Sequence, residues 1–219
     1  MVAGLLGHDR LLDTGQQLLG LGQRQAQAGD VGPLFHIAKL DVGQGDRLVL
    51  LGRNGVGKSR LVALLRRAVT EEVPGVQVSP SVVLGHADQG MAHLPDSQTP
   101  HRFISARPGN GDGRATSLLA GAGIGVDAQA RPIGRLSPGQ KARLGLLALR
   151  LAEPNFYLLD EPTNHVDIPG QERLEAELLA HGATCVLVSH DRSFIRAVGT
   201  RFLLIEGGHA REVPDATLP

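Results

Sequence analysis

The residue types with the clearest chemistry lie at positions 52–59, which read Gly-Arg-Asn-Gly-Val-Gly-Lys-Ser. They fit the pattern G-x-x-x-x-G-K-[ST], in which glycines let the backbone curl until successive N–H groups point at phosphate oxygens. Lys58 can reach the outer phosphates of a nucleotide, and the Ser59 hydroxyl can ligate Mg²⁺. An ordinary glycine-rich turn is the alternative interpretation. The predicted nucleotide-binding residues are Gly52, Arg53, Asn54, Gly55, Val56, Gly57, Lys58, Ser59 and Arg60.

Two adjacent acids, Asp160 and Glu161, follow the apolar run 156–159. In an open α/β sheet, ligands bind beyond the carboxyl ends of the strands, where the glycine-rich loop also lies. Asp160 is then placed to hold Mg²⁺ through water, and Glu161 to orient or deprotonate an attacking water. A solvated acidic strand end would explain the same two residues in isolation, but the neighbouring phosphate loop favours a catalytic role.

Two further groups could bind phosphate. Ser137 precedes a predicted helix, and its hydroxyl together with the N–H groups of Gly139 and Gln140 would form an anion site, to which Lys141 adds positive charge. His190 follows the apolar run 184–188, where an imidazole can hydrogen-bond a terminal phosphate oxygen. Serine caps and lone histidines are common structural features, so these two assignments depend on the phosphate loop.

The elements that must position these groups can be read from apolar periodicity. Short continuous apolar runs predict strands at 48–51, 82–84, 156–159, 184–188 and 201–205. Helical spacing predicts helices at 59–69, 139–151, 170–180 and 192–198, with a weaker one at 116–122. Continuously apolar strands that alternate with helices indicate an α/β fold with a mostly parallel sheet flanked by helices on both faces.

Composition limits the class of protein. The 219 residues are 42% hydrophobic, which excludes disorder for the whole chain, and 22 basic residues balance 22 acidic ones. This neutrality gives no electrostatic reason to expect nucleic acid as a partner. The single cysteine, Cys185, excludes an internal disulfide and is expected in the core. No apolar run reaches the length of a membrane span and no signal peptide is apparent, so we expect a soluble, cytoplasmic protein without membrane insertion.

Three segments in a fixed order resemble the motif series of ABC ATPases: 136–143 (Leu-Ser-Pro-Gly-Gln-Lys-Ala-Arg), 158–167 (Leu-Leu-Asp-Glu-Pro-Thr-Asn-His-Val-Asp) and 189–194 (Ser-His-Asp-Arg-Ser-Phe). The resemblance covers about residues 33–213. It implies a P-loop NTPase fold for 33–219, with a small helical subdomain at about 90–150 and an antiparallel β edge. Residues 1–32 are left as an ill-determined N-terminal segment.

The resemblance also implies roles for individual residues. Ser137, Pro138, Gly139 and Gln140 match the signature loop, which contacts the γ-phosphate bound to an opposite cassette. His190 matches the switch histidine, and Asp167 matches the loop that passes between two cassettes. Gln89 resembles the glutamine that senses Mg²⁺ and water, which gives Ser59, Gln89 and Asp160 as metal residues. The implied cofactors are ATP and Mg²⁺, and the implied partner is a second cassette in a homodimer or hetero-pair.

Some positions depart from the family pattern. No aromatic residue precedes Leu34 to stack on adenine, and Phe35 falls where a strand is expected. Pro138 replaces the first glycine of the usual signature, although proline suits the first turn of a helix. His86 and His93 show no ligand spacing with carboxylates or cysteine and are interpreted as surface residues.

Three functional hypotheses follow. The 163–167 run (Thr-Asn-His-Val-Asp) is most similar to the second cassette of ABC-F proteins, which favours an ATPase that remodels a ribosome or another assembly. The same phosphate chemistry would serve the ATP-binding subunit of an ABC membrane transporter. A shortened, non-catalytic cassette is the third. In the first two hypotheses the chain hydrolyses ATP to ADP and phosphate, and only as a dimer.

Overall fold

The computed structural model describes residues 17–21, 24–27, 33–37, 39–88, 91, 93–180 and 182–214. Within them, the main sheet has the strand order β2-β3-β11-β10-β5-β9-β8-β7. Its parallel centre consists of β10 (Arg201–Glu206), β5 (Arg47–Leu51), β9 (Thr184–Val188), β8 (Phe156–Asp160) and β7 (Leu84–Ala87). At one edge, β11 (His209–Val213) pairs antiparallel with β10 and β2 (Arg24–Gln27) pairs antiparallel with β3 (Pro33–Ile37). The expected mostly parallel sheet with an antiparallel edge is confirmed.

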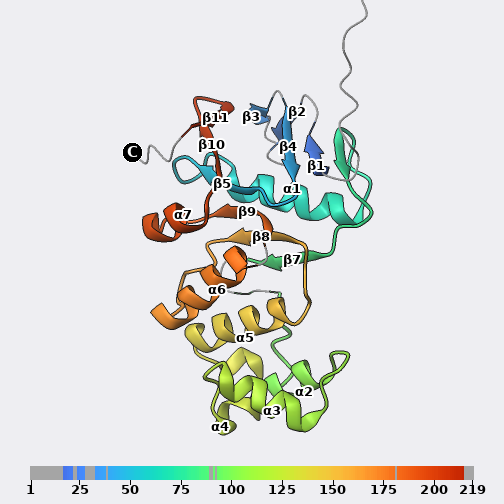
Figure 1. Cartoon of the computed structure of the whole chain (residues 1–219), viewed down its shortest axis with the longest axis vertical. Helices are drawn as coiled ribbons and strands as arrows, with labels where there is room; N and C mark the ends of the chain where they lie inside the picture. Colours follow the sequence, from blue (N-terminus) through green and yellow to red (C-terminus); the bar gives the residue numbers. More distant parts are fainter. Residues whose placement is uncertain are drawn as a thin grey trace, which may run out of the picture.

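Both faces of the central strands are buried, as their continuously apolar sequences predict. Leu48 and Leu50 of β5 face one core, while Val49 and Leu51 face the other. The first core contains helix α1 (Lys58–Thr70), which packs between the main sheet and a smaller antiparallel sheet. That smaller sheet comprises β4 (Leu40–Gly43), β1 (Gln17–Leu21) and β6 (Val76–Val78). Figure 1 shows α1 lying between β4 and β9.

The second core is covered by α5 (Pro138–Arg150), α6 (Ile168–Ala180) and α7 (Arg192–Val198). It continues into the helical subdomain, where Ile104, Leu119, Ile124 and Ile133 are fully buried. That subdomain contains α2 (Pro100–Ser105), α3 (Asp112–Gly121), α4 (Val126–Gln129) and a short 3-10 turn, Ile133–Arg135. Figure 1 shows α2, α3 and α4 gathered at the end of the molecule opposite β3 and β11. The subdomain is therefore joined to the sheet through one apolar core.

Several elements differ from the sequence-based expectation. The strand expected at 82–84 is found at Leu84–Ala87, because that is where the backbone pairs in register with β8. The segment 1–32, for which no structure was assigned, contributes β1 and β2. Leu19 of β1 is buried between β4 and β6, a non-local pairing that periodicity cannot reveal. Phe35 lies buried in β3, as expected. Across the described residues, no helix combines the length and apolar character needed to span a membrane.

Candidate functional site

The phosphate loop joins β5 to α1. Gly52 has φ 138°, and a Cβ added there would lie 2.5 Å from the carbonyl oxygen of Ile205 in β10, so only glycine fits. Gly57, with φ 109°, stands at the N-cap of α1 and provides no side-chain cap. The first N–H groups of α1 are therefore left without a side-chain partner from the cap, and the helix dipole adds positive potential there. This arrangement suits a bound phosphate.

Lys58 is almost fully buried although it carries an ammonium group. Its Nζ donates to the carbonyl oxygens of Gly52 at 2.7 Å and Arg53 at 3.1 Å, and these bonds hold the loop curled. Burial lowers the pKa of Lys58, whereas the charges of Glu161 and Asp160 oppose that shift. A phosphate would offer this cation anionic acceptors, which bind more strongly than carbonyl groups.

A hollow of about 500 Å³ opens in front of the loop. The loop contributes Asn54, Gly55, Gly57, Lys58, Ser59 and Arg60 to its wall. The opposite wall contains Asp160, the last residue of β8, together with Glu161, which follows it, and His190, which lies just after β9. The structure thus brings most of the predicted nucleotide, metal and catalytic residues to one hollow. Gly52, Arg53 and Val56 shape the loop without lining it.

Glu161 has the most constrained geometry in this hollow. Its backbone adopts φ 53°, which is unusual for a residue other than glycine, and its N–H donates to Val188 O at 2.9 Å. The side chain is 9% exposed, and its Oε2 accepts the His190 N–H at 3.3 Å. Oε1 lies 3.3 Å from His190 Nε2 but accepts no hydrogen bond from the described residues. A buried carboxylate oxygen without a hydrogen bond is available to a water molecule in the hollow.

Burial raises the pKa of Glu161, and the His190 imidazole and backbone N–H only partly offset this. A carboxyl with a raised folded-state pKa favours folding when protonated, so its contribution falls as pH rises from its ordinary value through the raised one. We therefore expect Glu161→Gln to raise the unfolding temperature at neutral pH. The gain should vanish in acid below the ordinary pKa of 4.5, where the carboxyl is neutral in both states. Thermal unfolding at both pH values measures this, and a gain that is equal at both would contradict it.

The predicted signature loop lies outside the hollow. Ser137 caps α5 through a capping box: its Oγ accepts the Gln140 N–H at 3.2 Å, and its own N–H donates to Gln140 Oε1 at 3.0 Å. Pro138 occupies the first helical turn, as expected from its ring geometry. Ser137 and Pro138 are exposed, while Gly139 approaches the 161–167 loop, where an added Cβ would lie 3.2 Å from His165 O. The Gln140 N–H predicted to bind an anion is thus taken by Ser137 Oγ, while the exposed Ser137 and Pro138 leave the helix start accessible from outside this chain.

The charges near this helix have partners within the chain. Lys141 Nζ pairs with Asp96 Oδ1 at 3.0 Å, so its positive charge is less available than the sequence suggested. Arg143 pairs with Asp167 Oδ2 at 2.9 Å, and Asp167 Oδ1 accepts the Gly170 N–H at the start of α6. Asp167 thus fixes the beginning of α6 relative to α5. Its assignment to an interface between cassettes stays a prediction.

Four other positions remain to be compared with the sequence-based expectation. Gln89 lies outside the described residues. Asn164 lines the hollow although it was not singled out, and its place in the Asp-Glu-Pro-Thr-Asn run could have identified it. His93 is exposed, as expected, but His86 is half-buried, and both histidines lie beside Asp88, contrary to the expectation that they form no ligand spacing with carboxylates.

Comparisons with known proteins agree with this geometry. A protein-family model described as "ABC transporter" matches residues 35–164. The chain is 30% identical over 203 residues to the ribosome protection protein VmlR of Bacillus subtilis (strain 168), covering 92% of this chain and 37% of VmlR. It is 34% identical over 206 residues to the tylosin resistance ATP-binding protein TlrC of Streptomyces fradiae, covering 91% of this chain and 37% of TlrC. The chain spans about a third of the length of the curated relatives it matches.

Solved structures support the fold. The ATP-binding cassette MJ0796, in a dimeric post-hydrolysis state bound to ADP and Pi, superposes with a TM-score of 0.71 at 19% identity. The superposition covers 90% of this chain and 98% of MJ0796. At this level of identity the similarity establishes the fold of the chain. Its chemistry has to be inferred from the residues that line the hollow.

Proposed function

Because this chain belongs to the ABC transporter family, we propose that it binds Mg-ATP at the 52–60 loop and hydrolyses it when a second cassette closes on the site. The relatives at 30–36% identity are of the ABC-F branch, as the sequence motifs indicated. The observation that carries the proposal is the shared hollow of about 500 Å³, which is lined by both a buried lysine, Lys58, and a buried glutamate, Glu161.

The chemistry proposed is in-line attack of water on the γ-phosphate, giving ADP and phosphate. Glu161 orients the water and takes its proton at Oε1, the oxygen that accepts no hydrogen bond from the described residues. Lys58 exchanges its loop carbonyl partners for phosphate oxygens. His190 lies beside Glu161 with an exposed side chain, so its imidazole can reach a phosphate oxygen. Ser59 and Asp160 carry the oxygen donors that would hold Mg²⁺, which neutralises phosphate charge when bound.

A second cassette is proposed because one chain does not complete its own site. Residues 137–140 do not line the hollow, and Ser137 and Pro138 at the start of α5 are exposed, so this helix start is accessible to an anion held by another chain. A head-to-tail pair would place the α5 start of one cassette over the phosphate loop of the other. Each of the two nucleotides would then be held by residues of both chains.

We expect ATPase activity per chain to rise with protein concentration, because the complete site forms only on association. Steady-state turnover over a wide dilution series measures this dependence. Activity strictly proportional to protein concentration, down to very dilute samples, would contradict a homodimeric site.

The process that hydrolysis serves is proposed from the relatives VmlR and TlrC, which are named for ribosome protection and tylosin resistance. We propose that ATP-driven closure acts on the ribosome or a comparable assembly. Co-sedimentation of the Glu161→Gln protein with ribosomes, in the presence and absence of ATP, tests this proposal. Co-purification with membranes instead would favour a transporter subunit, and absence of any turnover in the unaltered protein would favour a non-catalytic cassette.

A further inference from the structure

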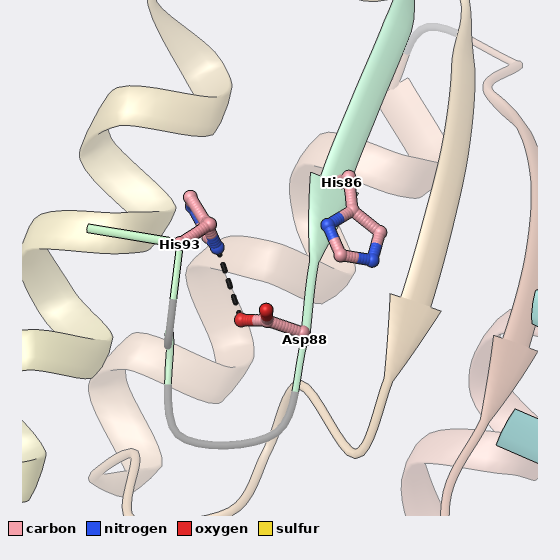
Figure 2. Close-up of side chains that lie close together, drawn as sticks. All are labelled: His86, Asp88 and His93. Carbon is pink, nitrogen blue, oxygen red and sulfur yellow. Dashed lines mark hydrogen bonds and ion pairs between the residues drawn. The ribbon is translucent and has the colours of Figure 1, made fainter. Parts of the chain in front are cut away.

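We propose that His86, Asp88 and His93 form a binding site for a divalent transition-metal ion, with Zn²⁺ the ion that suits their donor set. Two of these residues lie at the end of β7, one in the strand and one directly after it. The third comes from the segment that leads toward the helical subdomain. Figure 2 shows His93 facing Asp88, with the His86 ring nearby on β7, on the other side of the strand in this view.

The distances between donor atoms are close to those of a metal site. His93 Nδ1 lies 3.0 Å from Asp88 Oδ1, and one donor atom from each of the three residues lies within 4.8 Å of the others. Zinc bonds of 2.0–2.2 Å in tetrahedral geometry place ligands about 3.4 Å apart. Ion binding would require the His86 donor atom to move closer to the other two.

An ion pair alone does not explain the arrangement. The contact between His93 and Asp88 accounts for two of the side chains, but it gives no reason for the His86 ring to lie 5.9 Å from the His93 ring. A dication bound by the two imidazole nitrogens and the carboxylate would give all three side chains one common partner.

The three side chains combine proximity with access from solvent. The half-buried His86 brings imidazole nitrogens beside Asp88 and His93. The Asp88 and His93 side chains are 27% and 33% exposed, which gives an ion access from solvent. Imidazole nitrogen combined with one carboxylate favours zinc and its transition-metal neighbours over Mg²⁺, which prefers oxygen ligands alone.

An ion bound by these three residues would also affect how neighbouring elements are held together. Met91, between the ligands in sequence, is buried against α5, where a Cβ added to Gly145 would lie 2.4 Å from the Met91 sulfur. An ion at this site would tie β7 to the segment that packs on the helix carrying the proposed signature loop. Because the ion binds only the folded arrangement, it should raise the unfolding temperature.

The test uses the full chain without a polyhistidine tag, after treatment with a chelator and without nucleotide. Co²⁺ is added as a spectroscopic probe, because its visible absorption strengthens when low-symmetry nitrogen and oxygen ligands replace water. Zn²⁺ is then titrated to displace it, and thermal unfolding is measured with and without Zn²⁺. We expect one ion per chain, displacement by Zn²⁺ but not by Mg²⁺, and a higher unfolding temperature with Zn²⁺.

Variants locate the site among the nine histidines of the chain. Asp88→Asn and His93→Ala should each weaken binding at least about tenfold, in line with the sensitivity of metal sites to loss of supporting groups. His209→Ala removes an exposed histidine of β11 and should leave binding unchanged. Circular dichroism of each variant establishes that it is folded. Absence of Co²⁺ absorption in the unaltered protein, or equal binding in folded His93→Ala, would overturn the proposal.

Discussion

Replacement of Glu161 by glutamine is expected to slow ATP hydrolysis by about 10²–10⁴-fold, the usual contribution of a positioned general base. The side chain keeps its shape, and its carbonyl oxygen can still accept the His190 N–H that Glu161 Oε2 now accepts. The change therefore removes proton acceptance while leaving the hollow intact. Steady-state phosphate release and equilibrium binding of a fluorescent ATP analogue measure the two effects separately.

The matched control is Glu72→Gln, which makes the same chemical change at an exposed position after α1. Its turnover should equal that of the unaltered protein. If Glu161→Gln turned over ATP within a few-fold of the control, Glu161 would not be the group that activates water. Loss of nucleotide binding in Glu161→Gln would instead indicate that the substitution damages the phosphate site.

Replacement of Lys58 by alanine is expected to weaken ATP binding by about 10- to 100-fold. The reason is the loss of charge-assisted hydrogen bonds to phosphate, each worth about 1.5–3 kcal/mol. A second effect acts on the loop itself, because Lys58 Nζ also bonds the carbonyl oxygens of Gly52 and Arg53. Calorimetric titration with ATP in the presence of Mg²⁺ measures the change.

The chain has three lysines, which makes the control simple. Lys39→Ala removes an exposed lysine that pairs with Asp41 and should leave ATP affinity unchanged. Equal affinity in Lys58→Ala and Lys39→Ala would mean that the 52–59 loop does not bind the nucleotide phosphates.

Much of the site could be predicted from sequence because its parts are local. The sequence of residues 52–59 is by itself enough to predict a phosphate-binding loop. The apolar run before Asp160 shows that the two acids lie at the carboxyl end of a strand. The same continuous runs predicted a sheet buried on both faces, which Leu48 and Val49 now show by facing opposite cores. Ser137 and Gln140 formed the predicted helix start because a capping box spans only four residues.

Other features required contacts that no local pattern contains. Strand β1 is held by β4 and β6, both distant in sequence, so residues 1–32 gave no interpretable periodicity. The Lys141–Asp96 pair joins residues far apart in the chain, and it removes a positive charge that the sequence alone assigned to the anion site. His86 and Asp88 are only two residues apart, but residue spacing did not indicate that His93 also lies beside them.

The central claim is that each ATP is held by the phosphate loop of one cassette and the α5 start of another. It is tested most directly by mixing two inactive proteins, Lys58→Ala and Ser137→Ala. In a mixed head-to-tail pair, one site combines both defects and the other combines an intact loop with an intact helix start. If the two proteins pair at random in a symmetric dimer, the mixture should therefore recover roughly a quarter of the activity of the unaltered protein. Activity no greater than the sum of the two separate proteins would contradict the shared site.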